Sequence, residues 1–292
     1  MVAGWAVVLS ALVYLCLLFT IAHWGDYAGR RILHGSTRAT VAALSLGVYC
    51  TSWTFYGSVG LATRSGLDFL AIYIGPILVI GLGHTLVARV VRVARTQNIS
   101  SIADFVAARY GKSERVAALV TVIALVGSIP YIALQLKAVS ASLDVFLTAT
   151  SGAAPPTIPG VGDLALVVAI VLAFFAVAFG TRHTDATEHQ DGLMMAISME
   201  SIVKLVAFLV VGVYVTFFMF GGPGAILDSP AVRGLGPAII ERTSGFGSYV
   251  TLILLSCCAA LLLPRQFHMT VVENRDIGDL KRAAWLFPLY LV

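Results

Sequence analysis

Charged residues are scarce in this sequence. Only 12% of its 292 residues are Asp, Glu, Lys or Arg, whereas 59% are hydrophobic and the mean hydropathy is +0.92. A soluble globular chain carries roughly 25% charged residues. So much apolar surface with so little charge cannot be buried in one aqueous core, so a soluble domain is excluded and the lipid bilayer is the expected surrounding. The net charge of +4 is modest and gives no indication of a nucleic-acid partner.

Cysteine is also scarce, and catalytic motifs are missing. The four cysteines lie inside apolar runs without the spacing of a disulfide framework or a zinc site. His183 and His189 are six residues apart, which suits a solvated loop better than a metal site. No phosphate loop, nucleophile triad or kinase motif is present. We therefore expect no enzymatic activity, cofactor or metal site in this segment.

Long apolar runs are what the sequence does have. A transmembrane helix needs about 20 apolar residues, and such stretches occupy residues 3–23, 39–63, 68–90, 116–147, 163–180, 192–220 and 246–263. The first run lacks the basic flank of a secretory signal, so we interpret it as a retained helix. An eighth stretch begins near Ala283 and is cut off at Val292. The prediction is an all-α, polytopic transmembrane helical bundle of about eight helices, with the last one truncated.

The positions of Lys and Arg predict the orientation. If the N-terminus lies outside, the outer loops hold only Arg64, Arg233 and Arg242, and the spans hold Lys137 and Lys204. All other Lys and Arg residues then fall in inner loops. Positive residues concentrate on the cytoplasmic side of membrane proteins. We therefore expect a multi-pass protein of the bacterial inner membrane with its N-terminus outside.

The second span carries an unusual polar centre. Residues 50–60 (CTSWTFYGSVG) place hydroxyl groups and two glycines at the depth of the bilayer midplane. Such residues are tolerated where a helix is broken and lines a cavity; close packing through small residues is the alternative. Under the first interpretation, the backbone near Thr51 and Ser52 meets a small polar solute, and Trp53 and Tyr56 complete the pocket.

Three further spans contain polar residues. In the seventh span we expect a second break at Ser256 and Cys257, which would also meet the solute. The fourth span supplies Tyr131 and Gln135 as hydrogen-bonding groups for that solute.

Ionisable groups inside spans are costly and mark functional sites by default. Lys137 either contacts the solute or a partner carboxylate, or extends outward to the interface. Glu200 and Lys204 are four residues apart on one helix face; a structural salt bridge is the favoured interpretation, and a proton relay or gate is the alternative. Together with Cys50, these three residues are our candidates for ion coupling or gating.

Three segments together resemble the sodium:solute symporter family. Residues 51–60 resemble its substrate-lining first core helix, residues 101–111 (SIADFVAARYG) a cytoplasmic signature, and residues 264–269 (PRQFHM) with 274–276 (NRD) the loop after its sixth core helix. Residues 129–139 (IPYIALQLKAV) and 181–189 (TRHTDATEH) are most similar to the symporter-like modules fused to bacterial sensor histidine kinases of the CbrA type.

This resemblance implies a LeuT-type fold with inverted repeats. Residues 1–292 would form one symporter-like membrane domain, with 3–23 as an extra leading helix, 39–220 as the first five-helix repeat and 246–292 as the start of the second. It also implies an amino acid as solute, histidine in particular, and C-terminal kinase domains in the parent protein.

Three interpretations of function remain: a sensory or transport input of a sensor histidine kinase, a truncated stand-alone cation-coupled symporter, and a membrane scaffold without transport. Sodium-coupled members carry part of the ion site on an eighth core helix that this chain lacks. The coupling ion, Na+ or H+, is therefore open.

Overall fold

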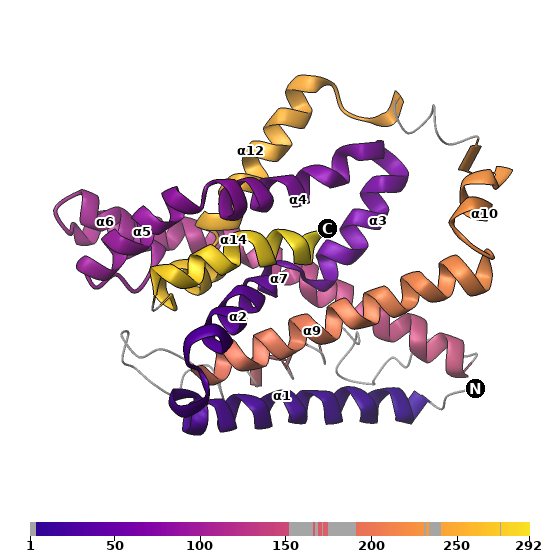
Figure 1. The fold of residues 1–292 in the computed structure, drawn as a ribbon, viewed down its shortest axis with the longest axis horizontal. Coiled ribbons are helices and arrows are strands. Elements are labelled where there is room, and N and C mark those ends of the chain that lie inside the picture. The colour runs from indigo at the N-terminus through magenta and orange to yellow at the C-terminus, as the bar shows by residue number, and fades with distance from the viewer. Residues whose placement is uncertain are drawn as a thin grey trace.

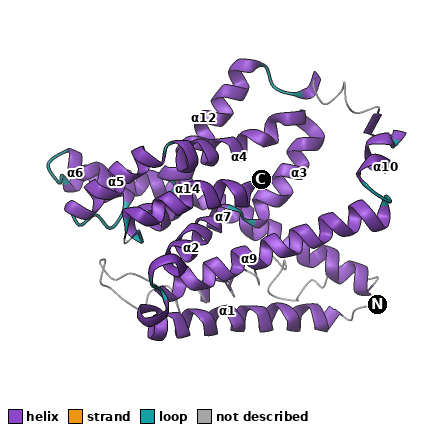
Figure 2. Ribbon diagram, viewed as in Figure 1, coloured by secondary structure: helices purple, strands orange, loops and turns teal. Residues whose placement is uncertain are grey.

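The computed structural model describes residues 4–151, 166, 169–170, 172–174, 191–230, 232–233, 241–274 and 276–292. Within these residues every element is helical, and no strand occurs (Figure 2). The prediction of an all-α fold is therefore confirmed. The span expected at residues 163–180, together with His183 and His189, lies largely or wholly outside the described residues.

The structure consists of α-helices, with short 3-10 and π-helical segments between some of them. They are α1 (Gly4–Ile32), α2 (Gly35–Ser45), α3 (Ser52–Ser65), α4 (Leu70–Pro76), α5 (His84–Thr96), α6 (Ile102–Arg109), α7 (Glu114–Ser151), α9 (Asp191–Val213), α10 (Pro223–Asp228), α12 (Phe246–Leu262), α13 (Pro264–Phe267) and α14 (Ile277–Leu291). The 3-10 turns are Leu46–Tyr49 and Gly66–Phe69, and the π turns are Ile77–Leu82, Tyr214–Met219 and His268–Val272.

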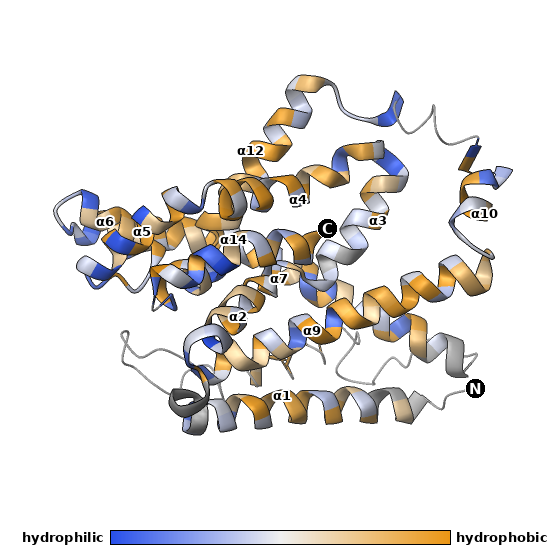
Figure 3. Cartoon of the chain, in the orientation of Figure 1, coloured by the Kyte–Doolittle hydropathy of each residue, from blue (hydrophilic) through white to orange (hydrophobic). Residues whose placement is uncertain are grey.

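Several helices are long and apolar enough to cross a bilayer. Within the described ranges, four stretches qualify: Leu9–Tyr27, Tyr56–Leu82, Glu114–Phe146 and Asp191–Met219. The bent pair Phe246–Leu262 and Pro264–Val272 would be a fifth. These helices consist largely of hydrophobic residues (Figure 3), and many of their large apolar side chains are exposed. Such a surface is stable only against lipid, so the chain is a membrane protein.

The long helices α1 and α9 run side by side, and α6 and α10 lie at opposite ends of the molecule (Figure 1). Small residues allow the first two helices to approach closely. A Cβ atom added to Gly25 would lie 2.7 Å from Gly192 Cα, and the Gly192 amide donates to the Asp26 carboxylate at 2.9 Å. Glycine contacts of this kind are typical of helix packing in membranes.

Two arginines join α2 to α14 at their first turns. Arg38 pairs with Asp279 at 2.7 Å, and Arg282 donates to the Ser36 carbonyl at 2.7 Å and to the Thr40 hydroxyl at 2.8 Å. Burial raises the pKa of the Asp279 carboxyl, and the Arg38 guanidinium opposes this shift. Segments about 240 residues apart in the chain are thereby held together.

The second expected span is broken, as the sequence predicts. The 3-10 turn ends at Tyr49, Cys50 and Thr51 are extended with ψ of 101° and 174°, and α3 begins at Ser52. This break divides the predicted stretch 39–63 into α2 with its 3-10 turn on one side and α3 on the other.

The predicted break at Ser256 and Cys257 is wrong, because both residues lie within the uninterrupted helix α12. The chain bends by 55° one to two turns later, where Leu263 is extended with ψ 132° ahead of Pro264. Proline lacks an amide donor and disfavours a helical conformation in the residue before it. The position of Pro264 therefore explains why the helix ends here.

Candidate functional site

The break at Cys50 and Thr51 exposes two helix ends to the interior of the molecule. Four amide groups at the start of a helix and four carbonyl groups at its end have no partner within that helix. The two ends also carry opposite partial charges, positive at the N-terminus of α3 and negative at the end of the preceding turn. The groups that meet these ends come from α7, α9 and α13.

Thr51 and Thr54 cap the N-terminus of α3. The Thr54 amide donates to Thr51 Oγ1 at 3.4 Å, and the Thr51 amide donates to Thr54 Oγ1 at 3.2 Å. The Thr54 hydroxyl in turn donates to the Tyr49 carbonyl at 3.3 Å. This is a capping box, in which two side chains satisfy backbone donors reciprocally. The hydroxyl-rich sequence at the break is therefore what defines the start of α3.

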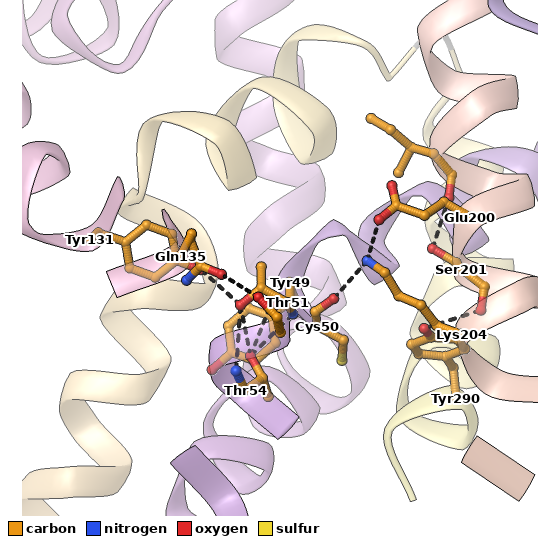
Figure 4. Close-up of polar contacts among 12 residues, drawn as sticks. Tyr49, Cys50, Thr51, Thr54, Tyr131, Gln135, Glu200, Ser201, Lys204 and Tyr290 are labelled. Atoms are coloured by element: carbon orange, nitrogen blue, oxygen red, sulfur yellow. Dashed lines mark hydrogen bonds and ion pairs between the residues drawn. The ribbon is translucent and has the colours of Figure 1, made fainter. Parts of the chain in front are cut away.

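On one side of the break, α7 presents two of the predicted solute-binding residues (Figure 4). Tyr131 Oη lies 3.3 Å from Thr51 Oγ1, and the Ser52 hydroxyl donates to Gln135 Oε1 at 3.3 Å. Tyr131 and Gln135 are four residues apart, so they share one face of the helix. The structure thus brings together Thr51, Ser52, Tyr131 and Gln135, as the sequence analysis expects.

Arg265, the first residue after Pro264 in α13, reaches the same cluster. Its Nη2 donates to Tyr131 Oη at 2.5 Å, and its guanidinium carbon lies 4.5 Å from the centroid of the tyrosine ring. The bend at Leu263 directs this side chain toward Tyr131, whereas the sequence predicts Arg265 in a cytoplasmic loop. Arg265 is the functional candidate that sequence reasoning missed, since 134 residues separate it from its partner.

Two donors in this cluster have no hydrogen-bond partner among the described residues. They are Gln135 Nε2 and Arg265 Nε, both buried atoms. A buried donor without a partner costs free energy, and native structures satisfy most such groups. Both unpaired groups are donors, and Arg265 is cationic, so the cluster is suited to a ligand that offers acceptor oxygens.

On the other side of the break, α9 presents a lysine and a glutamate (Figure 4). Lys204 Nζ donates to the Cys50 carbonyl at 3.0 Å and pairs with Glu200 Oε1 at 2.7 Å. The predicted salt bridge between Glu200 and Lys204 is therefore present. The contact of Lys204 with the break was not predicted; the signal available was an ionisable pair inside an apolar stretch.

Packing fixes α9 against the turn before the break. A Cβ atom added to Gly47 would lie 2.9 Å from Ser201 Cβ, so only glycine allows this approach. Ser201 is 1% exposed, and its carbonyl accepts a hydrogen bond from the Tyr290 hydroxyl of α14 at 3.3 Å. The distance between Lys204 and the Cys50 carbonyl thus depends on contacts from three elements.

Ser256 and Cys257 contact α4 rather than the break itself. Ser256 Oγ donates to the Ile72 carbonyl at 2.9 Å, and the Cys257 thiol donates to the Gly75 carbonyl at 3.5 Å. Ser256 Oγ also lies 3.3 Å from Tyr49 Oη, which connects it to the residue just before the break. These two predicted residues hold helices together next to the site.

The remaining candidates lie elsewhere. The Tyr56 hydroxyl shares a hydrogen bond of 2.8 Å with Ser142 on the exposed side of α3, one turn away from the break. Lys137 is exposed on α7 and has no ion pair with any described residue. The side chain of Trp53 is outside the described part of the structure. No group of three or more metal-binding side chains occurs among the described residues.

Comparison with known proteins supports a transport-related fold. Residues 27–154 match the model of the sodium:solute symporter family. No curated protein and no solved structure matches the chain. The matched range includes the break at Cys50 and Thr51 and the face of α7 that carries Tyr131 and Gln135. Together with the apolar helices, this match identifies a membrane protein with a solute transporter-like module.

Proposed function

We propose that the chain recognises a small polar solute, an amino acid, at the break between Cys50 and Ser52. The observation that carries this proposal is the convergence of Tyr131, Gln135 and Arg265 on the N-terminal end of α3. Discontinuous helices of this kind form the substrate sites of many transporters. The match to a symporter family over residues 27–154, which include the break, Tyr131 and Gln135, supports this assignment.

The chemistry of the cluster favours a solute with a carboxylate. The N-terminus of a helix attracts negative charge, and its free amide groups donate to anions. The Arg265 guanidinium adds a positive charge, and the free Gln135 amide adds a further donor. A carboxylate accepts several hydrogen bonds at once, so it would satisfy both unpaired donors.

In this proposal the module is the input of a bacterial sensor histidine kinase. The resemblance of residues 129–139 and 181–189 to such modules supports it. Solute binding would shift the balance between two conformations of the module, and kinase domains in the parent protein would respond. A ligand shifts such a balance only through a difference in affinity for the two conformations. The protein would lie in the inner membrane with its N-terminus outside.

Solute binding to the purified, full-length protein tests the proposal. Each radiolabelled amino acid would be measured at equilibrium with the wild type and with Arg265→Met and Gln135→Leu. Loss of one hydrogen bond to a charged group costs roughly 1.5–3 kcal/mol, so we expect each variant to weaken binding about 10- to 150-fold.

Thr121→Val is the matched control. Thr121 is exposed on the same helix as Gln135, and its hydroxyl donates to the Ala117 carbonyl of its own helix. Binding should be unchanged in this variant. Failure of all amino acids to bind, or equal binding by the wild type and the two site variants, would contradict the proposal and favour a membrane scaffold.

Uptake into proteoliposomes separates the two transport-related alternatives. A stand-alone symporter accumulates the labelled amino acid against its gradient. A sensory input that does not transport binds the amino acid without accumulating it, and the autophosphorylation rate of the complete protein changes when the amino acid is added.

A further inference from the structure

The carbonyl end of the broken helix carries a partial negative charge that has to be balanced. Because the chain is extended at Cys50 and Thr51, no backbone amide among the described residues donates to the Cys50 carbonyl. In transporters with discontinuous helices, such unwound carbonyls and half-helix ends coordinate the coupling cation. The carbonyl of Cys50 is therefore where a sodium ion would be expected in a sodium-coupled protein.

In this chain the Lys204 side chain already contacts the Cys50 carbonyl oxygen. Lys204 Nζ donates to the Cys50 carbonyl at 3.0 Å while it also pairs with Glu200 at 2.7 Å. A carbonyl oxygen and a carboxylate oxygen are both ligands of hard cations. The two oxygens thus resemble a cation site whose cation is a lysine ammonium.

A sodium ion does not fit at these oxygens while the ammonium is there. The ammonium lies within hydrogen-bond distance of both oxygens, so a second cation on the same pair would stand next to a like charge. The close contact between Gly47 and Ser201 holds α9 at this distance from the break. The expectation of sodium from the family match therefore disagrees with the residues present.

We propose that Lys204 is a tethered cation that replaces sodium at the break. Binding at the break then requires no sodium, although the matched family is named for that ion. Removal of the ammonium leaves the Cys50 carbonyl and the Glu200 carboxylate as a sodium site. The inference concerns the same break as the proposed function, but its test needs no solute.

The test is the thermal stability of the purified, full-length protein in sodium chloride and in choline chloride at equal ionic strength. A ligand that binds the folded state raises the apparent melting temperature with its concentration. We expect no sodium-specific shift for the wild type and a saturable upward shift for Lys204→Met. The double variant Lys204→Met, Glu200→Gln should lose this shift, because a neutral amide then replaces the Glu200 carboxylate and no negatively charged ligand is left at the site.

Lys281→Met is the matched control, because it removes an exposed lysine of another helix, α14. Its melting temperature should be as insensitive to sodium as that of the wild type. A saturable sodium-specific shift in the wild type would overturn the proposal, as would the same sodium response in Lys204→Met and in the wild type. If Lys204→Met does not fold, Lys204→Gln removes the charge and retains a donor for the Cys50 carbonyl.

These results are separable from those on the proposed function. A protein that binds no amino acid but gains a sodium response in Lys204→Met supports the tethered cation alone. A protein that binds an amino acid only in sodium supports the solute site and overturns the tethered cation.

Discussion

Gly75 of α4 packs closely against Ser256 and Cys257 of α12. A Cβ atom added to Gly75 would be 2.5 Å from Ser256 Cβ and 2.6 Å from the Cys257 backbone nitrogen. Real Cβ atoms do not tolerate such distances, and backbone cannot move away as a flexible side chain would. The two hydrogen bonds from α12 to the Ile72 and Gly75 carbonyls depend on the same approach.

We predict that Gly75→Ala destabilises the protein by about 1–3 kcal/mol, the usual cost of overpacking a well-packed contact. The measurement is the midpoint of thermal unfolding in detergent. Gly127→Ala on α7 is the control, because a Cβ atom there meets nothing within 4 Å. Since alanine favours helix more than glycine does, Gly127→Ala should leave the midpoint unchanged or raise it. Equal midpoints for Gly75→Ala and the wild type would show that α4 and α12 are not held at this distance.

Single residues were predictable from the sequence where a local rule applied to them. Hydroxyls and glycines inside an apolar run pointed to Thr51 and Ser52, and spacing along one helix paired Glu200 with Lys204. The contact of Arg265 with Tyr131 depends on the bend at Leu263 and on a separation of 134 residues. No local pattern carries that information.

The start of α3 depends on one side chain more than on any other. Thr51 Oγ1 accepts a hydrogen bond from the Thr54 amide, the Thr51 amide donates to Thr54 Oγ1, and Thr51 Oγ1 lies 3.3 Å from Tyr131 Oη. Serine and threonine are preferred at this position because their oxygen satisfies an amide group that has no partner in the helix.

We predict that Thr51→Val lowers stability by about 0.5–2 kcal/mol, the range measured for loss of an N-cap oxygen. Thr51→Ser retains the oxygen and should restore most of the stability. Thermal unfolding of both variants beside Thr121→Val provides the comparison. A midpoint for Thr51→Val equal to that of Thr121→Val would show that the cap contributes nothing to α3.

Among the elements, the sequence predicts one helix break at the right position and the other at the wrong position. The first break coincides with the polar residues that indicated it, because those residues form the cap. The second was placed at Ser256 and Cys257 from their polarity, whereas the chain breaks at Pro264. The serine and cysteine donate to carbonyls of α4, so their polarity serves packing between helices. Pro264 was the signal for the bend, and it was interpreted only as part of a loop motif.

At the scale of the whole molecule, the predicted orientation requires α6 and α10 to lie on opposite sides of the membrane. They do lie at opposite ends of the structure (Figure 1). Tyr110 and Leu227, which mark these two ends, are 64% and 66% exposed, so other described parts of the chain do not cover either position.

We predict that a membrane-impermeant maleimide labels Leu227→Cys in intact cells and labels Tyr110→Cys only after the cells are made permeable. Both substitutions are made in a protein whose four natural cysteines are replaced by alanine or serine. The distribution of Lys and Arg is the physical reason, because positive loops are retained on the cytoplasmic side. The reverse pattern of labelling would mean that the N-terminus lies inside.

The overall class of the molecule follows from composition, but its internal arrangement does not. Hydropathy alone predicted helices in a membrane, since lipid leaves few other ways to satisfy the backbone. Hydropathy alone also overestimates the number of uninterrupted helices. The run at 39–63 is divided at Cys50 and Thr51, and the run at 68–90 is interrupted near Gly83. Which helices are neighbours depends on close contacts such as Gly25 with Gly192, which only the folded chain shows.

The arginine contacts between α2 and α14 have a mechanical consequence. Arg38 and Arg282 fasten the first turn of one helix to the first turn of the other. The helical hydrogen bonds that follow α2 end at the extended residues Cys50 and Thr51. A movement of α2 about Cys50 and Thr51 would therefore act directly on α14 through these two arginines.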